Sequence, residues 1–354
     1  MKKIQLTYQN TIRCPIYVGH NLVDGIKRSS GRYSQIFYIT EKPLLKHLRQ
    51  YLGAKPAEIF TIAGGESSKT LKTAQAAINF MLSADIDRSS LIVGFGGGVV
   101  TDLTGFVASI LLRGVNFLLV PTTLLGMIDA TIGGKTGVNF ANYKNMVGTI
   151  AQPQAVFIDI EHLRTLPKEQ FQSGLGELVK CGVGFNKKLF WLLEKGKLKE
   201  QLAKAIYLAA KSVAKISAQD PEDKLHIRDQ LNLGHTLGHA LESTSGFKLM
   251  HGLAVAKGLE FAAYVSCTQG HLSKQEYERI VRLLKMLDLV QPVKLDPTQL
   301  IAAIKKDKKR VGEEVYFVFI KAIGQAFVEP LSLETLGSLI TSFTNSQLVA
   351  SPSQ

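Results

Sequence analysis

The feature that most constrains the fold is a change near residue 160 in the pattern of predicted secondary structure. Before it, short β-rich runs alternate with helical stretches; the strand candidates are IQLTY, PIYVG, QIFYIT, EIFTIA, LIVGFG, NFLLVPT and AVFIDI. From Lys168 to about Asp288 nearly every segment has helical period, and a short β signal returns in EVYFVFI. Such alternation is typical of a largely parallel α/β sheet. We therefore expect two domains, an α/β domain over residues 1–158 and a mainly helical domain over residues 159–354.

The composition excludes several classes of protein. The 354 residues suffice for two domains with large cores, and no apolar run approaches the ~20 residues of a membrane span. The basic start MKKIQLTYQN lacks the apolar stretch of a signal peptide. The cysteines Cys14, Cys181 and Cys267 are odd in number and far apart, which argues against a disulfide framework and suits a reducing compartment. We expect a cytoplasmic protein that binds no membrane.

The net charge of +13, from 42 Lys plus Arg against 29 Asp plus Glu, raises the question of a polyanionic partner. A nucleic-acid-binding protein would concentrate such charge in a recognised module. The chain shows no zinc-finger spacing, RNP-type aromatic strand or basic-leucine heptad, and its densest basic run is KKDKKR at 305–310. We expect no nucleic-acid partner, and part of the excess can attract an anionic substrate.

One helical segment has an unusual polar face. Its members follow spacings of 4, 3, 4 and 3 and are Arg228, Asn232, His235, His239 and Glu242. On a single helix they fall within an arc of roughly 80°. A cation, an amide, two imidazoles and a carboxylate on one face indicate the wall of a metal or substrate site, and imidazoles suit zinc. His235 and His239, at i and i+4, could form a chelating pair, and another histidine follows in MHGLAV.

A glycine cluster follows the strand candidate LIVGFG. In GFGGGVVTDLTGF the glycines permit a tight turn, and the N-terminus of the next helix favours phosphate. The pattern is not the GxGxxG fingerprint, because Val99 stands where the third glycine would be, and it lacks the GK[ST] of a P-loop. Asp102 is expected in the first helical turn after the glycines. The turn either binds a nucleotide pyrophosphate or is a tight turn with no ligand.

Two further segments favour the nucleotide. GGESSKT at 64–70 is a second glycine-led turn, in which Glu66 and Lys69 can bond ribose hydroxyls and phosphate. VPTTLLGMIDATIGGKTGVN at 120–139 is too rich in Thr, Gly, Asp and Lys for a plain core segment. Lys135 stands there between a glycine pair and Thr-Gly, which gives a flexible frame for an ammonium aimed at an anion.

Taken together, these stretches resemble one family, the 3-dehydroquinate synthases. The matching motifs are GGESSKT, GGGVVTDLTGFVAS, RGVNFLLVPTTLL, DATIGGKTGVN, KNMVGTIAQPQAV, GELVKCG, LNLGHTLGHALE, HGLAVAKG and DKKRVG, in the family's order from residue 64 to 312. The resemblance implies an N-terminal Rossmann-like NAD-binding domain and a C-terminal, mainly α-helical metal-binding domain. It also implies a carbon–oxygen lyase that converts 3-deoxy-D-arabino-heptulosonate 7-phosphate to 3-dehydroquinate and phosphate, in the shikimate pathway of aromatic amino acid biosynthesis.

The reaction that the resemblance implies uses NAD catalytically. A ring hydroxyl is oxidised, phosphate is eliminated, the ketone is reduced again, the ring opens and an intramolecular aldol reaction closes the carbocycle. The oxidation has a physical rationale, because a new ketone acidifies the adjacent C–H and permits the elimination. NAD is therefore regenerated in each turnover.

The resemblance also assigns roles to residues. The metal ligands are Glu177, His235 and His251, for zinc or cobalt, which makes His239 a substrate-side residue that moves protons instead of a ligand. The positions that match catalytic or substrate-contacting residues are Lys135, Lys180, Arg228, Asn232, His239, Asn145, Arg113 and Lys308, with Lys309 as the alternative to Lys308. The positions that match NAD contacts are Glu66, Lys69, Gly97, Gly98, Val99, Asp102, Thr122, Thr123, Asp129, Lys135, Lys144 and Thr165. Arg113 matches an arginine that reaches into the partner subunit's site, which implies a homodimer.

Departures from the family pattern keep alternatives open. Ala214 occupies the place of a usual lysine, and Lys211 or Lys215 could replace it. His226 stands where the family tends to have glycine, and TEKP at 40–43 lacks the usual polar pair for the adenine ribose. The alternatives are another sugar-phosphate cyclase and an NAD- and metal-dependent polyol dehydrogenase; the intact metal ligands disfavour an inactive scaffold.

Overall fold

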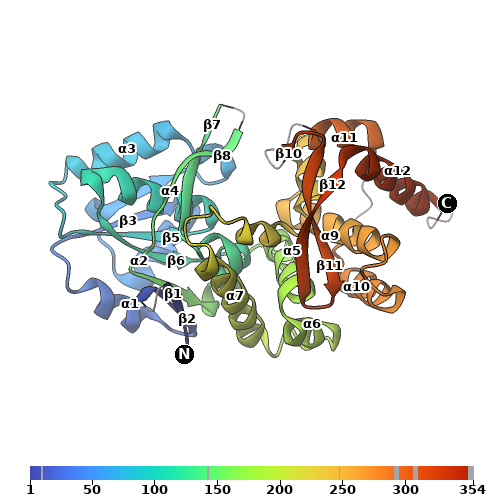
Figure 1. Cartoon of the computed structure of the whole chain (residues 1–354). Coiled ribbons are helices and arrows are strands. Elements are labelled where there is room, and N and C mark those ends of the chain that lie inside the picture. The colour runs from blue at the N-terminus through green and yellow to red at the C-terminus, as the bar shows by residue number, and fades with distance from the viewer. Residues whose placement is uncertain (9–10, 142, 247, 291–294, 306–309, 350–354) are drawn as a thin grey trace. The chain divides into compact units, whose positions relative to one another are not determined.

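The computed structural model describes residues 1–8, 11–141, 143–246, 248–290, 295–305 and 310–349. The chain divides into two compact units: unit 1 is Met1–Phe171 with Val213–Lys224, and unit 2 is Gln172–Ser212 with Leu225–Gln354 (Figure 1). Unit 1 thus continues past the expected boundary at residue 158. One reason is Asp159, whose carboxylate accepts hydrogen bonds from the backbone N–H groups of Asn21 and Leu22 at 3.2 and 2.8 Å.

Unit 1 is built on a seven-stranded sheet in the order β1-β2-β9-β6-β5-β3-β4. Its strands are β1 Lys2–Tyr8, β2 Thr11–Gly19, β3 Ile36–Glu41, β4 Ile59–Ile62, β5 Leu91–Gly96, β6 Asn116–Pro121 and β9 Ala155–Asp159. Every neighbouring pair is parallel except β1 and β2, which confirms the expected α/β sheet. The central strand β5 is buried along its whole length, as a parallel strand covered on both faces must be.

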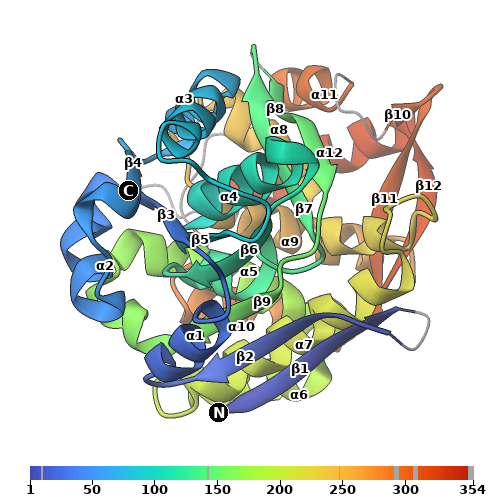
Figure 2. The ribbon, with the colours of Figure 1, turned by 90° about the vertical axis from the view of Figure 1, so that its left-hand side faces the viewer.

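Along the chain, the helices of unit 1 alternate with these strands, and a hairpin forms a separate two-stranded sheet (Figure 2). The α-helices are α1 Val23–Ser30, α2 Leu45–Leu52, α3 Leu71–Leu82 and α4 Gly98–Ile110. Short turns are η1 Lys42–Leu44, η2 Pro56–Glu58, η3 Glu66–Ser68, η4 Leu111–Arg113, the π-turn η5 Gly126–Ala130, and η6 Ile160–Thr165. The antiparallel hairpin is β7 Lys135–Phe140 and β8 Tyr143–Ile150. Thr70 caps α3 by accepting a hydrogen bond from the Thr73 N–H at 3.1 Å.

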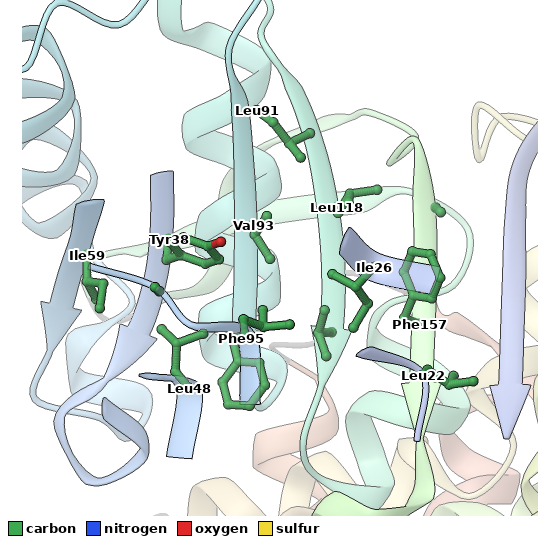
Figure 3. Packing of buried hydrophobic residues seen from close by; sticks show 14 residues of the cluster. Leu22, Ile26, Tyr38, Leu48, Ile59, Leu91, Val93, Phe95, Leu118 and Phe157 are labelled. Atoms are coloured by element: carbon green, nitrogen blue, oxygen red, sulfur yellow. The ribbon is translucent and has the colours of Figure 1, made fainter. Parts of the chain in front are cut away.

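The core of unit 1 packs α1 and α2 against one face of the sheet (Figure 3). Leu91, Val93 and Phe95 alternate along β5, so all three side chains point to the same face. Ile26 of α1 and Leu48 of α2 belong to the same cluster. Burying each such side chain contributes about 1.5–3 kcal/mol. This apolar cluster therefore fixes the strands through one face of the sheet and does not involve polar groups at their carboxyl ends.

Unit 2 is mainly helical, as expected. Its elements, with α5 and α7 extending into unit 1, are α5 Lys168–Phe185, α6 Lys187–Glu194, α7 Leu202–Gln219, η7 Ile227–Asn232, α8 His235–Thr244, α9 His251–Thr268, α10 Lys274–Met286, α11 Pro297–Ile304 and α12 Leu333–Val349. A three-stranded sheet joins β10 Arg310–Val311, β11 Glu314–Ala322 and β12 Gln325–Ser332. Asn186, Ser273 and Asp296 cap α6, α10 and α11 through their side chains. In the part of the chain that the structure describes, no helix is long and apolar enough to cross a bilayer.

Candidate functional site

Three side chains that could hold a metal ion converge in unit 2. Glu177 lies in the middle of α5, whereas His235 and His251 are the first residues of α8 and α9. Their ligand atoms all lie within 4.8 Å of one another. The Nε2 atoms of His251 and His235 are 3.2 and 3.5 Å from Glu177 Oε1. Glu177 is 0% exposed and His235 is 8% exposed, so the donors meet inside the unit.

Glycines next to these ligands explain why three helices can deliver them to one point. A Cβ atom on Gly252 would lie 1.6 Å from the carbonyl oxygen of Ser173, and one on Gly176 would lie 1.9 Å from that of Gly252. A Cβ atom on Gly258 would lie 1.8 Å from the carbonyl oxygen of Gly234. Helix α9 therefore touches α5 and the start of α8 backbone to backbone. No side chain larger than hydrogen fits at these crossings.

Charges around Glu177 set its protonation state. Lys180, one turn later on α5 and fully buried, places Nζ 2.5 Å from Glu177 Oε2. Burial raises the pKa of the Glu177 carboxyl, but the Lys180 ammonium and the two histidines outweigh it and hold that pKa well below its usual value. Burial and Lys180 also hold the pKa of His235 well below its usual value. An ionised carboxylate and a neutral imidazole are the states in which these groups bind metals.

The far nitrogens of both histidines have their own partners. His235 Nδ1 lies 3.1 Å from the carbonyl oxygen of Leu233, and His251 Nδ1 lies 3.1 Å from Glu242 Oε2. Burial lowers the pKa of His251, but its hydrogen bonds to Glu177 and Glu242 raise it to about 10. Such outer partners orient imidazole ligands and raise their basicity. A carboxylate with two imidazoles fits zinc or cobalt and leaves positions open for substrate.

Glu242 is a residue whose role the sequence did not reveal. It appeared on the polar face of the predicted helix without a function, and the structure places it behind His251. A signal existed in its spacing, because Glu242 lies three residues after His239. His239, Glu242 and His251 also form a second group whose ligand atoms lie within 4.8 Å of one another.

The single helix predicted for residues 228–242 is wrong. Arg228 and Asn232 belong to η7, and α8 begins only at His235. Gly234 separates the two elements at φ +78°, a left-handed conformation that ends helical period. The rings of His235 and His239 lie 5.1 Å apart, but the ligand groups among the described residues place His235 with Glu177 and His251 instead. Arg228 is buried.

A polar network occupies unit 1. Lys69, which is 3% exposed, donates hydrogen bonds to the Asp102 carboxylate and to Asn145 Oδ1, the latter at 2.5 Å. Asn139 connects the network, because its N–H donates to the Lys69 carbonyl at 2.8 Å and its Nδ2 donates to Glu66 Oε1 at 2.8 Å. The Asn145 N–H donates to Asn139 Oδ1 at 2.9 Å. Asn139 is the last residue of the motif DATIGGKTGVN, and the motif alone did not indicate that it links other polar residues.

Asp102 corrects one further expectation. Helix α4 starts at Gly98, so Asp102 lies in its second turn and not in the first. Asp102 is therefore not a carboxylate stabilised by the helix dipole, since the dipole effect falls off within the first turn. Burial raises the pKa of Asp102 to about 6, and the Lys69 ammonium opposes this rise.

Of the remaining predicted NAD positions of unit 1, Gly97, Gly98, Val99, Thr122 and Thr123 lie at the glycine turn, and Asp129, Lys144 and Thr165 lie elsewhere. Gly97 precedes α4, Gly98 and Val99 begin it, and the Thr122 N–H donates to the Gly96 carbonyl at 2.9 Å. A Cβ atom on Gly97 would lie 3.0 Å from the methyl group of Thr123. Asp129 lies in η5, Lys144 is exposed on β8, and Thr165 is exposed at the end of η6.

The other predicted positions, and the residues that depart from the family pattern, stand outside these groups. Lys135 begins β7 and pairs with Asp223, and Arg113 is exposed in η4 at φ +63°. Lys308 and its alternative Lys309 lie outside the described residues. Ala214 is buried on α7, whereas Lys211 and Lys215 are exposed. His226, in the place of a family glycine, has φ +59°, a conformation that glycine adopts without strain.

Comparison with known proteins agrees with this geometry. Residues 59–173 match the domain described as 3-dehydroquinate synthase N-terminal, and residues 174–310 match the domain described as 3-dehydroquinate synthase C-terminal. The chain is 37% identical to a 3-dehydroquinate synthase of Helicobacter pylori (strain G27) over 79% of this chain and 82% of that protein. It is 36% identical to one of Dictyoglomus thermophilum over 88% of this chain and 90% of that protein.

Solved structures share the fold. A 2-epi-5-epi-valiolone synthase from Streptomyces hygroscopicus, solved with NAD+ and Zn2+, superposes with a TM-score of 0.83 at 25% identity over 96% of this chain and 99% of that one. A 2-deoxy-scyllo-inosose synthase superposes with a TM-score of 0.85 at 22% identity over the same shares. An iron-containing alcohol dehydrogenase reaches only 0.61 at 15% identity, covering 96% and 99% of the two chains. With both domains matched and such relatives over most of its length, the chain belongs to the 3-dehydroquinate synthase family.

Proposed function

We propose that this chain carries out the 3-dehydroquinate synthase reaction with a divalent cation held by Glu177, His235 and His251. The observation that carries the proposal is the convergence of these three ligand atoms within 4.8 Å, next to glycines that permit nothing larger. Zinc and cobalt suit the donor set equally. The valiolone synthase was solved with Zn2+ and the 2-deoxy-scyllo-inosose synthase with Co2+, which supports either metal.

Residues of unit 2 are assigned to holding the cation, binding the substrate and transferring protons. When bound, the cation polarises a substrate hydroxyl while NAD takes up and returns a hydride. Lys180 keeps Glu177 ionised, and Glu242 holds the His251 ring in one orientation. Buried Arg228 and half-buried Asn232 of η7 supply a cation and an amide for the anionic substrate, in keeping with the bidentate geometry of arginine. His239 is assigned to moving protons at the substrate.

The network of unit 1 is assigned to NAD. The free N–H groups at the start of α4 favour the pyrophosphate, and Lys69 with Glu66 supplies a cation and an acceptor. Glu41 adds a half-buried carboxylate at the end of β3, and burial raises its pKa. A carboxylate at the carboxyl end of a parallel strand is suited to accept hydrogen bonds from ribose hydroxyls.

A homodimer is the assembly that fits the hairpin of unit 1. Phe140, Tyr143, Met146 and Ile150 are exposed there, and among the described residues β8 pairs only with β7. Exposed apolar side chains on the edge strands of a two-stranded sheet mark an interaction surface. Light scattering of the purified chain is expected to give twice the monomer mass, and a monomer at micromolar concentration would contradict it. Among the described residues Cys14, Cys181 and Cys267 form no disulfide, which accords with a cytoplasmic location.

One experiment tests the function as a whole. Phosphate release from 3-deoxy-D-arabino-heptulosonate 7-phosphate is measured with catalytic NAD, with and without a chelator. We expect chelator-sensitive release, formation of 3-dehydroquinate and no net NADH. Release from sedoheptulose 7-phosphate or glucose 6-phosphate instead would indicate another sugar-phosphate cyclase. Steady NADH accumulation with a simple polyol would indicate a dehydrogenase.

A further inference from the structure

Lys135 has an acidic partner that comes from a distant part of the chain. Its Nζ lies 2.6 Å from Asp223 Oδ2, with the two side chains 55% and 33% exposed. Lys135 begins β7 directly after Gly133 and Gly134, which have φ +96° and +73°. Asp223 belongs to Val213–Lys224, which comprises the end of α7 and the loop after it and packs as part of unit 1. The ion pair therefore lies within one unit.

The loop that carries Asp223 is built to present it. Asp220 is buried, and its Oδ1 accepts a hydrogen bond from the Lys224 N–H at 2.8 Å. The Asp223 N–H donates to the Asp220 carbonyl at 3.1 Å, which closes a tight turn. Asp223 has φ +57°, a left-handed conformation that side-chain-bearing residues adopt at some cost. This turn aims the carboxylate at Lys135.

We propose that Asp223 is a positioning residue that holds the Lys135 ammonium until an anionic group of the substrate displaces it. The inference rests on the proposed function, and it takes Lys135 as a contact of the sugar-phosphate substrate, as the resemblance to the family implies. A phosphate must compete with the Asp223 carboxylate for the same ammonium. The charge of Asp223 therefore weakens binding of the phosphorylated substrate and hastens departure of the inorganic phosphate that the reaction releases.

The exposure of the pair suits such an exchange. A buried ion pair would hold the lysine permanently, whereas a half-exposed pair is weakly bound and easily exchanged. A phosphate carries more charge and more acceptor oxygens than one carboxylate, so it displaces Asp223 while the carboxylate still lowers its affinity. Asp223 thus orients the Lys135 ammonium and still leaves it able to bind a phosphate.

The test is the Asp223→Asn variant, with inorganic phosphate as the probe. Asparagine is nearly isosteric and tolerates positive φ, so the turn is retained. We expect the KM for 3-deoxy-D-arabino-heptulosonate 7-phosphate and the inhibition constant of inorganic phosphate each to fall about two- to fivefold, as for loss of one half-exposed charge pair. The kcat is expected to stay equal or to fall, because phosphate leaves more slowly. A merely structural role would not tighten phosphate binding.

Two further variants make the result decisive. Glu222→Gln removes a charge from the same loop, where Glu222 pairs with Lys224 at 2.7 Å, and should leave both constants unchanged. In a Lys135→Gln background, Asp223→Asn should have no effect. If Lys135→Gln raises the KM but Asp223→Asn leaves both constants unchanged or raises them, the role of Asp223 is refuted. If Lys135→Gln does not change the KM, the assignment of Lys135 as a substrate contact is refuted as well.

Discussion

The cluster of unit 2 that could hold a metal ion and the polar network of unit 1 are built in opposite ways. Glu177, His235 and His251 stand on three helices that touch through backbone atoms, and each ligand has a glycine next to it. Lys69 and Asn145, in contrast, come from a turn and from a hairpin strand. Metal ligands need fixed positions, whereas groups that clasp a long cofactor can come from segments that adjust. The two constructions should therefore respond differently to the same kind of change.

The largest effect is expected from Gly252→Ala. The new methyl group would lie 1.6 Å from the Ser173 carbonyl oxygen, so α9 must move away from α5 and carry His251 with it. Overpacking of this kind costs about 1–3 kcal/mol or more. We expect loss of bound metal and of turnover, together with a lower midpoint of chemical unfolding.

Gly196→Ala is the matched control for that variant. Gly196 has φ +67°, but no atom lies within 4 Å of the position its Cβ would take. Backbone strain alone should cost on the order of 1 kcal/mol and leave the metal and the activity in place. Retention of metal and full activity by Gly252→Ala would show that the helices are not fixed by this crossing.

His251→Ala should separate chemistry from folding. The variant removes a ligand but leaves the glycine crossing intact, so we expect turnover to vanish while circular dichroism and the unfolding midpoint stay close to those of the parent. His20→Ala, at an exposed histidine paired with Glu161, should retain full activity. Wild-type turnover in His251→Ala, with metal still bound, would refute the assignment of His251 as a ligand.

A smaller loss is expected from the lysine of the hairpin. Lys135→Ala removes a charge-assisted contact to an anion, so kcat/KM should fall about 10- to 100-fold, in line with the 1.5–3 kcal/mol of such contacts. Lys197→Ala changes an exposed lysine after α6 and should leave kcat/KM unchanged. Equal losses of kcat/KM in the two variants would mean that Lys135 makes no specific contact with the substrate.

The smallest effect concerns a buried histidine of unit 1 outside the network. His162 Nδ1 lies 2.9 Å from His47 Nε2, and burial, together with His47 and against the opposing effect of Asp159, lowers the pKa of His162 to about 4. Above the ordinary value of 6.5 the depressed pKa costs no stability, but as the pH falls from 6.5 toward 4 the unfolded chain binds a proton that the folded protein does not, so the fold loses stability. His162→Gln should remove about 2 kcal/mol of the loss in unfolding free energy between pH 7 and pH 5. Identical pH dependence in denaturant titrations of both proteins would contradict it.

The strands and helices with strong patterns could be predicted, but the hairpin could not. LIVGFG and NFLLVP are apolar runs and became β5 and β6. KTGVNF and YKNMVGTI, which form β7 and β8, contain glycine, lysine and asparagine, and β8 is largely exposed. Residues of this kind are depleted in strands, and no buried face imposes an alternation of apolar and polar side chains.

The candidate site divides along a similar line. The resemblance supplied the ligand set that the structure brings together, while periodicity alone favoured His235 with His239. Periodicity failed because Gly234 interrupts the predicted helix at φ +78°. Asn139, Glu242 and Asp223 escaped notice because each acts through a partner from another element. Contacts between elements depend on packing, which a local pattern does not contain.

The path of the chain between the two units has a consequence for anyone who wishes to divide this protein. The chain leaves unit 1 at Phe171, returns at Val213 and leaves again after Lys224. A fragment that ends at Phe171 would therefore lack one piece of its own unit, including the carboxylate that faces Lys135. The units are compact bodies but not separate genetic modules. Exchange of one unit between relatives has to transfer Val213–Lys224 together with the first 171 residues.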